Sequence, residues 1–299
     1  MTVPIETEQF AKLPNGTRLH YASAGERGKP LILFAHGFPE FWYAWEAQLR
    51  EFGIDHFAVA PDLRGFNLSD MPKEVSAYKA RHLVDDLRLL AANLGYEKFI
   101  LVAHDWGGAV AWNLAISFPQ LLEKLIIINS PHPWLFLKAL REDPVQQQSS
   151  QYMNWLRRKG SEQALMQNDF ALVEGFLRNL GKEIPTWYSD EVRERYHACW
   201  RRGLHGAINY YRATPLHPPT ETEPGPLALQ VNPEDMRIRV PTRVIWGESD
   251  HALPKNLIDG LEQWVDDLVI ERIAEGTHWV VHEQPHRING LIRQFLQSG

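Results

Sequence analysis

A carboxylate occupies the centre of a tight-turn motif in this sequence. Asp105 lies within AHDWGG, residues 103–108, which follows the apolar run FILVA and precedes a helical stretch over residues 109–118. Small residues two positions before and after the central one are typical of a nucleophile elbow, a strand-turn-helix that exposes its central side chain. The helix N-terminus favours the ionised carboxylate. Asp105 could instead only stabilise the helix dipole, but its place in the elbow favours a nucleophile.

An acid and a histidine complete a catalytic triad with this carboxylate. Asp250 ends the motif GESD after an apolar run, and His278 lies in GTHW near the C-terminus. The order nucleophile, acid, histidine is that of hydrolases with such an elbow. Asp235 and Glu248 compete with Asp250, and His282 competes with His278, but chain position favours the first of each. Because Asp105 needs no base to attack, His278 is free to activate a water molecule in a second step.

The motif HGFP, residues 36–39, follows the first apolar run. The backbone N–H of Phe38 could join that of Trp106 as an oxyanion hole, which stabilises negative charge on an oxygen as it develops. We expect His36, Phe38 and Trp106 to contact the substrate.

Short apolar runs alternate with helical stretches along much of the chain. The runs cover residues 30–35, 57–60, 99–103, 124–128 and 242–246, and helical patterns cover residues 80–94 and 256–264. This alternation predicts a mostly parallel, doubly wound α/β sheet.

The alternation stops between about Trp134 and Asp235, where the sequence is helical, aromatic and basic. We therefore predict an inserted helical cap domain over residues 134–235. The core would then comprise residues 1–133 and 236–299, and a length of 299 residues suits one domain with such an insertion.

Composition excludes several classes of partner. The formal charge is −6, with no run of like charge suited to nucleic acid or anionic lipid, and no apolar stretch approaches the roughly 20 residues of a membrane span. The single Cys199 excludes a disulfide framework, and the N-terminus lacks a signal-peptide pattern, so we expect a cytoplasmic protein. No cluster of His or carboxylate residues has metal-ligand spacing, and we expect neither a metal nor a cofactor.

Taken together, these motifs resemble those of epoxide hydrolases of the α/β-hydrolase fold. The resemblance covers the whole chain through HGFPEFWYAW, DLRGFNLSD, HDWGGAVAW, INSPHP, NYYRA, GESD and GTHW. It implies that Asp105 forms an ester with a small apolar epoxide, which His278-activated water then hydrolyses to a vicinal diol. It also implies that two cap tyrosines donate protons to the epoxide oxygen. By motif match these are Tyr211, flanked by Asn209 and Arg212, and Tyr152 in QYMNW.

Other functions remain open at this point. A haloalkane or haloacid dehalogenase would use the same Asp nucleophile, although the arginines that clamp fluoroacetate are absent after Asp105, where Trp106 and Ala109 stand. A ligand sensor built on this fold would be expected to lose a triad member, and none is missing. A serine esterase is disfavoured because the elbow holds no serine. A homodimer is neither indicated nor excluded.

Overall fold

The structure is a computed structural model that describes residues 3–178 and 184–298. Its centre is an eight-stranded sheet with the strand order β1-β2-β4-β3-β5-β6-β7-β8. The pairs β1/β2 and β2/β4 are antiparallel, and the remaining neighbours are parallel. The strands are β1 (Ile5–Lys12), β2 (Arg18–Ala24), β3 (Leu31–Ala35), β4 (Phe57–Pro61), β5 (Phe99–His104), β6 (Leu122–Ile128), β7 (Thr242–Gly247) and β8 (Leu268–Ile273).

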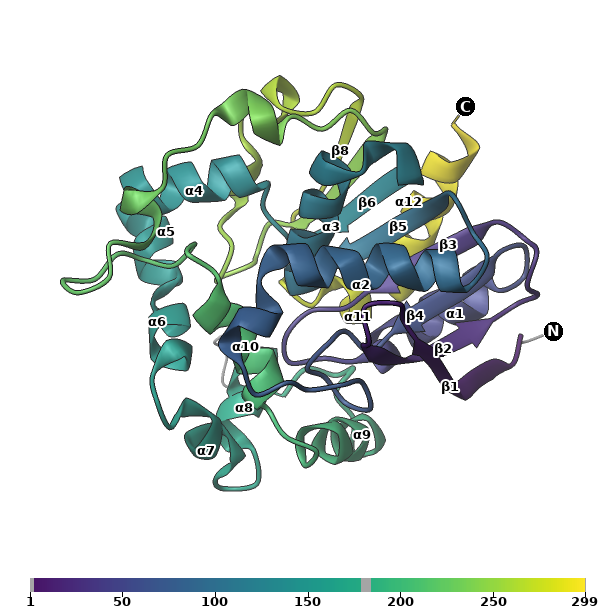
Figure 1. Cartoon of the computed structure of the whole chain (residues 1–299), viewed down its shortest axis with the longest axis horizontal. Helices are drawn as coiled ribbons and strands as arrows, with labels where there is room; N and C mark the ends of the chain where they lie inside the picture. Colours follow the sequence, from purple (N-terminus) through teal and green to yellow (C-terminus); the bar gives the residue numbers. More distant parts are fainter. Residues whose placement is uncertain (1–2, 179–183, 299) are drawn as a thin grey trace.

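The central strands are buried on both faces. Every residue of β3, β4 and β5 is buried, as expected for strands enclosed by helices on both sides. Figure 1 shows α2 and α3 in front of the sheet and α12 behind it. On α2, the buried Leu83, Leu87 and Leu90 recur at helical spacing and form its inner face. The core helices are α1 (Glu46–Phe52), α2 (Ala80–Asn93), α3 (Asp105–Ser117), α11 (Val280–Glu283) and α12 (Pro285–Gln297).

The strand register gathers several loops at one edge of the sheet. Ala103 of β5 pairs with Ala35 of β3 and Ile127 of β6, and Ile128 pairs with Ile245 of β7. Because these strands are parallel, the segments that follow them leave the sheet together at its carboxyl edge, where open α/β sheets bind ligands. The elbow, the HGFP loop and the segment after β7 therefore meet there.

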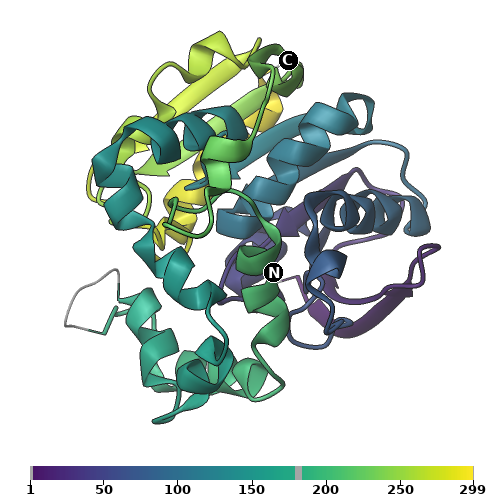
Figure 2. The same ribbon diagram turned by 60° about the vertical axis from the view of Figure 1, so that its left-hand side comes forward.

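A helical insertion lies between β6 and β7. In Figure 1 helices α4, α5, α6, α7 and α9 of this insertion follow the left and lower margins of the molecule and α10 lies inside them, and Figure 2 shows the insertion from a second side as a layer beside the sheet. Over the described residues 134–178 and 184–235 the chain forms helices and turns and no strand. The helices are α4 (Pro133–Glu142), α5 (Pro144–Ser149), α6 (Gln151–Arg157), α7 (Ser161–Met166), α8 (Ala171–Leu177), α9 (Asp190–Trp200) and α10 (His205–Ala213). The domain limits 1–133, 134–235 and 236–299 stay a prediction.

The predicted α/β class with a mostly parallel sheet is confirmed. The prediction of a helix over residues 256–264 is wrong: η6 (Lys255–Ile258) and η7 (Leu261–Gln263) are two short 3-10 turns, separated by Gly260, whose φ is +81°. This left-handed residue interrupts the helical pattern.

No helix in the described part of the chain is long and apolar enough to cross a membrane. The 3-10 turns are η1 (Trp42–Trp45), η2 (Val75–Tyr78), η3 (Pro119–Leu121), η4 (Gly225–Ala228), η5 (Pro233–Met236), η6 (Lys255–Ile258) and η7 (Leu261–Gln263).

Candidate active site

Asp105 lies at the sharp turn between β5 and α3. Its φ is +50°, a left-handed conformation that is strained for a residue with a Cβ, whereas the preceding His104 is extended. Strain of this kind is characteristic of functional sites and of the nucleophile elbow in particular. The side chain stands beside the first turn of α3, whose N–H groups have no partner within the helix. This position favours the ionised carboxylate.

Glycines allow the backbone to pack closely around this turn. A Cβ on Gly37 would lie 2.3 Å from Oδ1 of Asp105, and one on Gly107 would lie 2.3 Å from the carbonyl oxygen of Ala35. Neither position can hold a side chain unless its neighbours move. The HGFP loop after β3 is therefore held directly against the nucleophile.

Two hydrogen bonds fix the Asp105 carboxylate and its backbone. The Phe38 N–H donates to Oδ1 at 2.7 Å, and the Ser130 hydroxyl donates to the Asp105 carbonyl oxygen at 2.8 Å. Oδ2 lies 3.6 Å from Nε2 of His278. Of the two predicted oxyanion-hole donors, the Phe38 N–H thus contacts Oδ1, and the role of the Trp106 N–H, in the first turn of α3, stays a prediction.

His278 faces a second carboxylate through its other nitrogen. Nδ1 lies 2.6 Å from Oδ2 of Asp250, whose Oδ1 accepts the N–H groups of Ala252 and Leu253 at 2.8 and 2.9 Å. Burial alone would lower the pKa of His278, but the charge and hydrogen bond of Asp250, with the charge of Asp105, raise it to about 9. Burial alone would raise the pKa of Asp250, yet His278 and the other donors lower it.

A buried carboxylate also lies beneath the histidine. Oε2 of Glu40 lies 3.3 Å from Nδ1 of His104, and Nε2 of His104 donates to the carbonyl oxygen of His278 at 2.8 Å. Burial alone would raise the pKa of Glu40, but the facing imidazoles of His282 and His104 lower it far below its usual range. Glu40 is therefore an anion that contacts His104, the residue that donates to the backbone of His278.

Two tyrosines face the nucleophile from the helical insertion. Tyr152 of α6 and Tyr211 of α10 have ring centroids 6.1 Å apart, and Tyr211 packs edge-on against Trp106 and Phe38. Burial is the main cause that raises the pKa of Tyr152 and of Tyr211, and the charge of Asp105 adds to it. Both phenols therefore keep their protons at neutral pH and can donate them.

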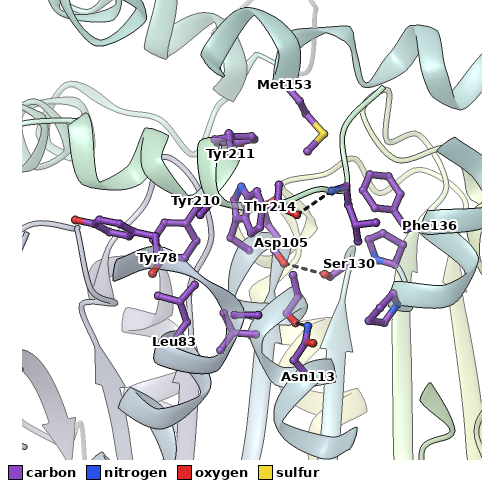
Figure 3. A pocket seen from close by; sticks show the side chains of 18 of the residues that line it. Tyr78, Leu83, Asp105, Asn113, Ser130, Phe136, Met153, Tyr210, Tyr211 and Thr214 are labelled. Carbon is purple, nitrogen blue, oxygen red and sulfur yellow. Dashed lines mark hydrogen bonds between the residues drawn. The ribbon is translucent and has the colours of Figure 1, made fainter. Parts of the chain in front are cut away.

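Two largely apolar cavities meet at these three side chains. One of about 360 Å³ and one of about 470 Å³ both include Asp105, Tyr152 and Tyr211 among their walls. Figure 3 shows the first, with Tyr211 and Met153 on one side of Asp105 and Leu83 and Asn113 on the other. The second includes His278. A substrate in either cavity can therefore reach the carboxylate.

The contacts of the predicted triad residues differ from those of the alternative residues considered for the same roles. In the described part of the chain, Asp250 is the carboxylate that contacts Nδ1 of His278, whereas Glu248 contacts Arg272 and Asp235 contacts Asn232. His282 contacts Glu40 and not Asp105 or Asp250. The hydroxyl of Tyr210 is directed away from the carboxylate and donates to the carbonyl oxygen of Arg64 at 2.9 Å.

The prediction that His36 contacts substrate needs correction. Its ring is completely buried, lies 2.9 Å from the Gly37 carbonyl oxygen, and accepts the Leu63 N–H at 3.0 Å. It lines neither cavity. His36 therefore braces the HGFP loop from behind, while Phe38 lines the second cavity and Trp106 the first.

Asn129 and the roles of Glu40 and His104 were not predicted from the sequence. Asn129 donates to Oδ2 of Asp250 at 2.8 Å and accepts the Gly247 N–H at 2.8 Å, so it joins the ends of β6 and β7. Its φ of +39° is a conformation in which Asn is enriched, and an Asn directly after a predicted strand was the available signal. Glu40 gave no such signal, because its burial depends on the insertion.

Comparison with known proteins gives consistent results. Residues 30–285 match the family described as the alpha/beta hydrolase fold. The chain is 34% identical to mouse epoxide hydrolase 4, over 95% of this chain and 77% of the mouse protein. It is 36% identical to epoxide hydrolase 1 of Caenorhabditis elegans, over 94% and 68% of the two chains.

A solved structure is similar over nearly the whole length of this chain. The crystal structure of the Bacillus megaterium epoxide hydrolase in complex with an inhibitor superposes with a TM-score of 0.88 at 32% identity, covering 97% of this chain and all of the other. In the described residues, no group of three or more His, Cys, Asp or Glu side chains is arranged to hold a metal ion.

Proposed function

This chain belongs to the epoxide hydrolases of the α/β-hydrolase fold, and we propose that it converts an epoxide to a vicinal diol through a covalent ester on Asp105. One observation carries the proposal: the two cavities share the Asp105 carboxylate and the phenols of Tyr152 and Tyr211. A nucleophile and two acids thus line one space, which is what opening a strained ether requires.

In the first step, a carboxylate oxygen of Asp105 attacks a ring carbon, and the bond between that carbon and the epoxide oxygen breaks. The leaving oxygen carries the electron pair as an alkoxide, which takes a proton from Tyr152 or Tyr211. Because both phenols are protonated at neutral pH, they stabilise this charge as it develops. The product is a hydroxyalkyl ester of Asp105.

In the second step, Nε2 of His278 takes a proton from water, and the resulting hydroxide attacks the carboxyl carbon of Asp105. The negative charge then rests on Oδ1, next to the N–H group of Phe38, and we expect the N–H of Trp106 to be the second donor. Collapse of this intermediate breaks the ester bond and leaves a protonated Asp105 carboxyl group and an alkoxide. The alkoxide takes the proton held by His278 to give the diol, and the Asp105 carboxyl group returns a proton to the tyrosinate left by the first step. Asp250 orients His278 and stabilises its charged form.

Esterification of Asp105 also prepares His278 for the second step. The negative charge of Asp105 is one cause of the raised pKa of His278, and the ester carries no such charge. The pKa of His278 therefore falls when the ester forms. A larger fraction of the histidine is then the free base that the second step needs.

Two variants test the mechanism. Asp105→Ala should abolish turnover of styrene oxide, and Asp235→Ala, which changes a carboxylate outside both cavities, should not. His278→Gln should accumulate the ester, visible as one added substrate mass on the peptide that contains Asp105. His286→Gln, at an exposed histidine, is its control. Near wild-type activity in the Asp105 variant would refute the mechanism.

A dehalogenase would use the same carboxylate, so the substrate decides between the two. A halide leaves as a stable anion and needs no proton donor, whereas an epoxide oxygen does. A panel of styrene oxide, haloalkanes and fluoroacetate, with analysis for diol, alcohol or glycolate, separates these reactions. The two phenols beside Asp105 support diol as the main product.

We also infer that the substrate is a small apolar epoxide that reacts with water in the cytoplasm. The apolar walls of the cavities support the first part, and the single buried Cys199 supports a reducing compartment. Cell fractionation with activity measured in each fraction tests the location. Size-exclusion chromatography with light scattering would decide between a monomer and a homodimer.

A further inference from the structure

A buried hydrogen-bonded cluster joins the helical insertion to the catalytic histidine. At its centre is Glu40, the residue after the HGFP loop, with 1% of its surface exposed. Its Oε1 accepts the Tyr196 hydroxyl at 2.9 Å and lies 2.5 Å from Nε2 of His282, while Oε2 faces His104. The mechanism above assigns no step to Tyr196 or His282.

One hydrogen bond, whose donor and acceptor are certain, connects the cluster to the backbone of His278. The carbonyl oxygen of His278 can only accept, so Nε2 of His104, at 2.8 Å, carries the donated proton. The rings of His104 and His278 also lie against each other, with centroids 4.7 Å apart. A displacement of Glu40 would therefore be transmitted to His278 through the side chain of His104 alone.

Residues on one face of α9, in the helical insertion, form hydrogen bonds to this cluster and to the HGFP loop beside it. Tyr196 donates to Glu40, and Trp200, one turn later, donates from Nε1 to the carbonyl oxygen of Pro39 at 2.7 Å. Trp187 of the insertion stacks on His282, with centroids 4.2 Å apart and an angle of 13° between the rings. The end of the HGFP loop is therefore fixed by contacts that exist only when α9 is seated on the core.

We propose that Tyr196 and His282 are positioning residues for ester hydrolysis: by holding the Glu40 carboxylate against His104 they fix His278, so that seating of α9 controls the second step. This inference rests on the proposed two-step mechanism. Neither side chain touches the substrate cavities. Their effect must pass through Glu40 and His104.

The charges around Glu40 determine the direction of the effect on pH. Glu40 faces His104 on β5, His282 on α11 and Tyr196 on α9, and its charge acts on His36 and His278 as well. The charges of Asp250, Asp105 and Glu40 all act on His278 itself. Removal of a donor from Glu40 leaves its negative charge less compensated, so His278 holds its proton more strongly. Removal of the charge itself has the opposite effect.

The matched control lies on the same helix. His197, next to Tyr196 on α9, is as buried as Glu40, and its Nε2 lies 2.8 Å from Oε1 of Glu174 within the insertion. His197→Gln therefore disturbs a buried imidazole–carboxylate pair on α9 without touching Glu40. Tyr196→Phe removes one oxygen atom and keeps the ring, so it decides the matter even if His282→Gln does not fold.

The experiment is stopped-flow kinetics of the full-length protein with styrene oxide, resolving ester formation from ester hydrolysis between pH 5 and 10. In Tyr196→Phe and His282→Gln, hydrolysis should slow by roughly 2- to 30-fold, the range that such networks transmit. Ester formation should change less. The acid limb of hydrolysis should move to higher pH in both, and to lower pH in Glu40→Gln.

Three results would overturn the inference: unchanged hydrolysis in Tyr196→Phe, equal slowing of both steps, or the same pH shift in His197→Gln. These differ from failure of the proposed function. If the wild-type protein forms no ester and no diol from any epoxide tested, the mechanism itself is wrong. If the wild type forms both and Tyr196→Phe behaves like it, only the role of the cluster is refuted.

Discussion

Nε2 of His278 lies 3.6 Å from Oδ2 of Asp105, beyond the roughly 3.2 Å reach of a hydrogen bond. The other nitrogen of the same ring lies only 2.6 Å from Asp250. His278 is thus hydrogen-bonded to Asp250 and forms no hydrogen bond to Asp105. Asp105 keeps an oxygen free for attack, and its charge still acts on His278.

The pH dependence of the two steps should therefore differ. The pKa of His278 is about 9 with Asp105 ionised, and the loss of that charge in the ester lowers it. We expect ester hydrolysis to rise along an acid limb with its midpoint below pH 9. Single-turnover kinetics from pH 5 to 10 measure this limb. A midpoint at or above 9 in the hydrolysis phase would show that His278 does not feel the charge of Asp105.

The same shift predicts how stability depends on pH. The pKa of His278 is raised from 6.5 to about 9 on folding, so its contribution to stability is fully present below about pH 6.5 and is lost as pH rises through 9. The difference in Tm between wild type and His278→Gln should shrink between pH 6.5 and 9.5. Differential scanning calorimetry of both proteins checks this, and a difference that grows with pH would contradict the assignment.

The two phenols should act on ester formation alone. Tyr152→Phe and Tyr211→Phe should each slow it by about 10² to 10³, the usual cost of losing one donor to a developing oxyanion, and the double variant should be nearly inactive. Any activity on a haloalkane should survive better. Pre-steady-state kinetics with both substrates provide the measurement.

Tyr210→Phe is the comparison for these variants, because Tyr210 adjoins Tyr211 but donates to Arg64. It should lower Tm by the loss of one buried hydrogen bond, and it should slow ester formation far less. Unchanged ester formation in both Tyr152→Phe and Tyr211→Phe would eliminate them as acids and favour the dehalogenase.

Gly37→Ala should disable the site through geometry. The added Cβ would lie 2.3 Å from Oδ1 of Asp105, so the carboxylate or the HGFP loop must move. A displacement of about 1 Å can cost about 10² in rate. Gly290→Ala on α12 is the control, since its Cβ would meet nothing within 4 Å. Steady-state rates and Tm values of both variants test this, and full activity in Gly37→Ala would show that the loop is not held against the nucleophile.

Local patterns in the sequence were sufficient for the sheet and for the elbow. The runs at residues 30–35, 99–103 and 242–246 correspond to β3, β5 and β7, because strands buried on both faces are rich in apolar residues. The elbow is readable because its small residues are required by the turn around Asp105. The helix expected at 256–264 failed because Gly260 adopts a left-handed conformation that the apolar spacing does not reveal.

Contacts between distant segments decided the rest. Asp250 and His278 are 28 positions apart, and only folding shows that they touch and that Glu248 turns to Arg272 instead. Glu40 is an ordinary acidic residue in the sequence. In the structure it is a buried anion, because α9, β5 and α11 surround it with a phenol and two imidazoles. The sequence by itself determines which groups are available for chemistry. The packing of the insertion on the core decides their burial, and burial and nearby charge set their protonation.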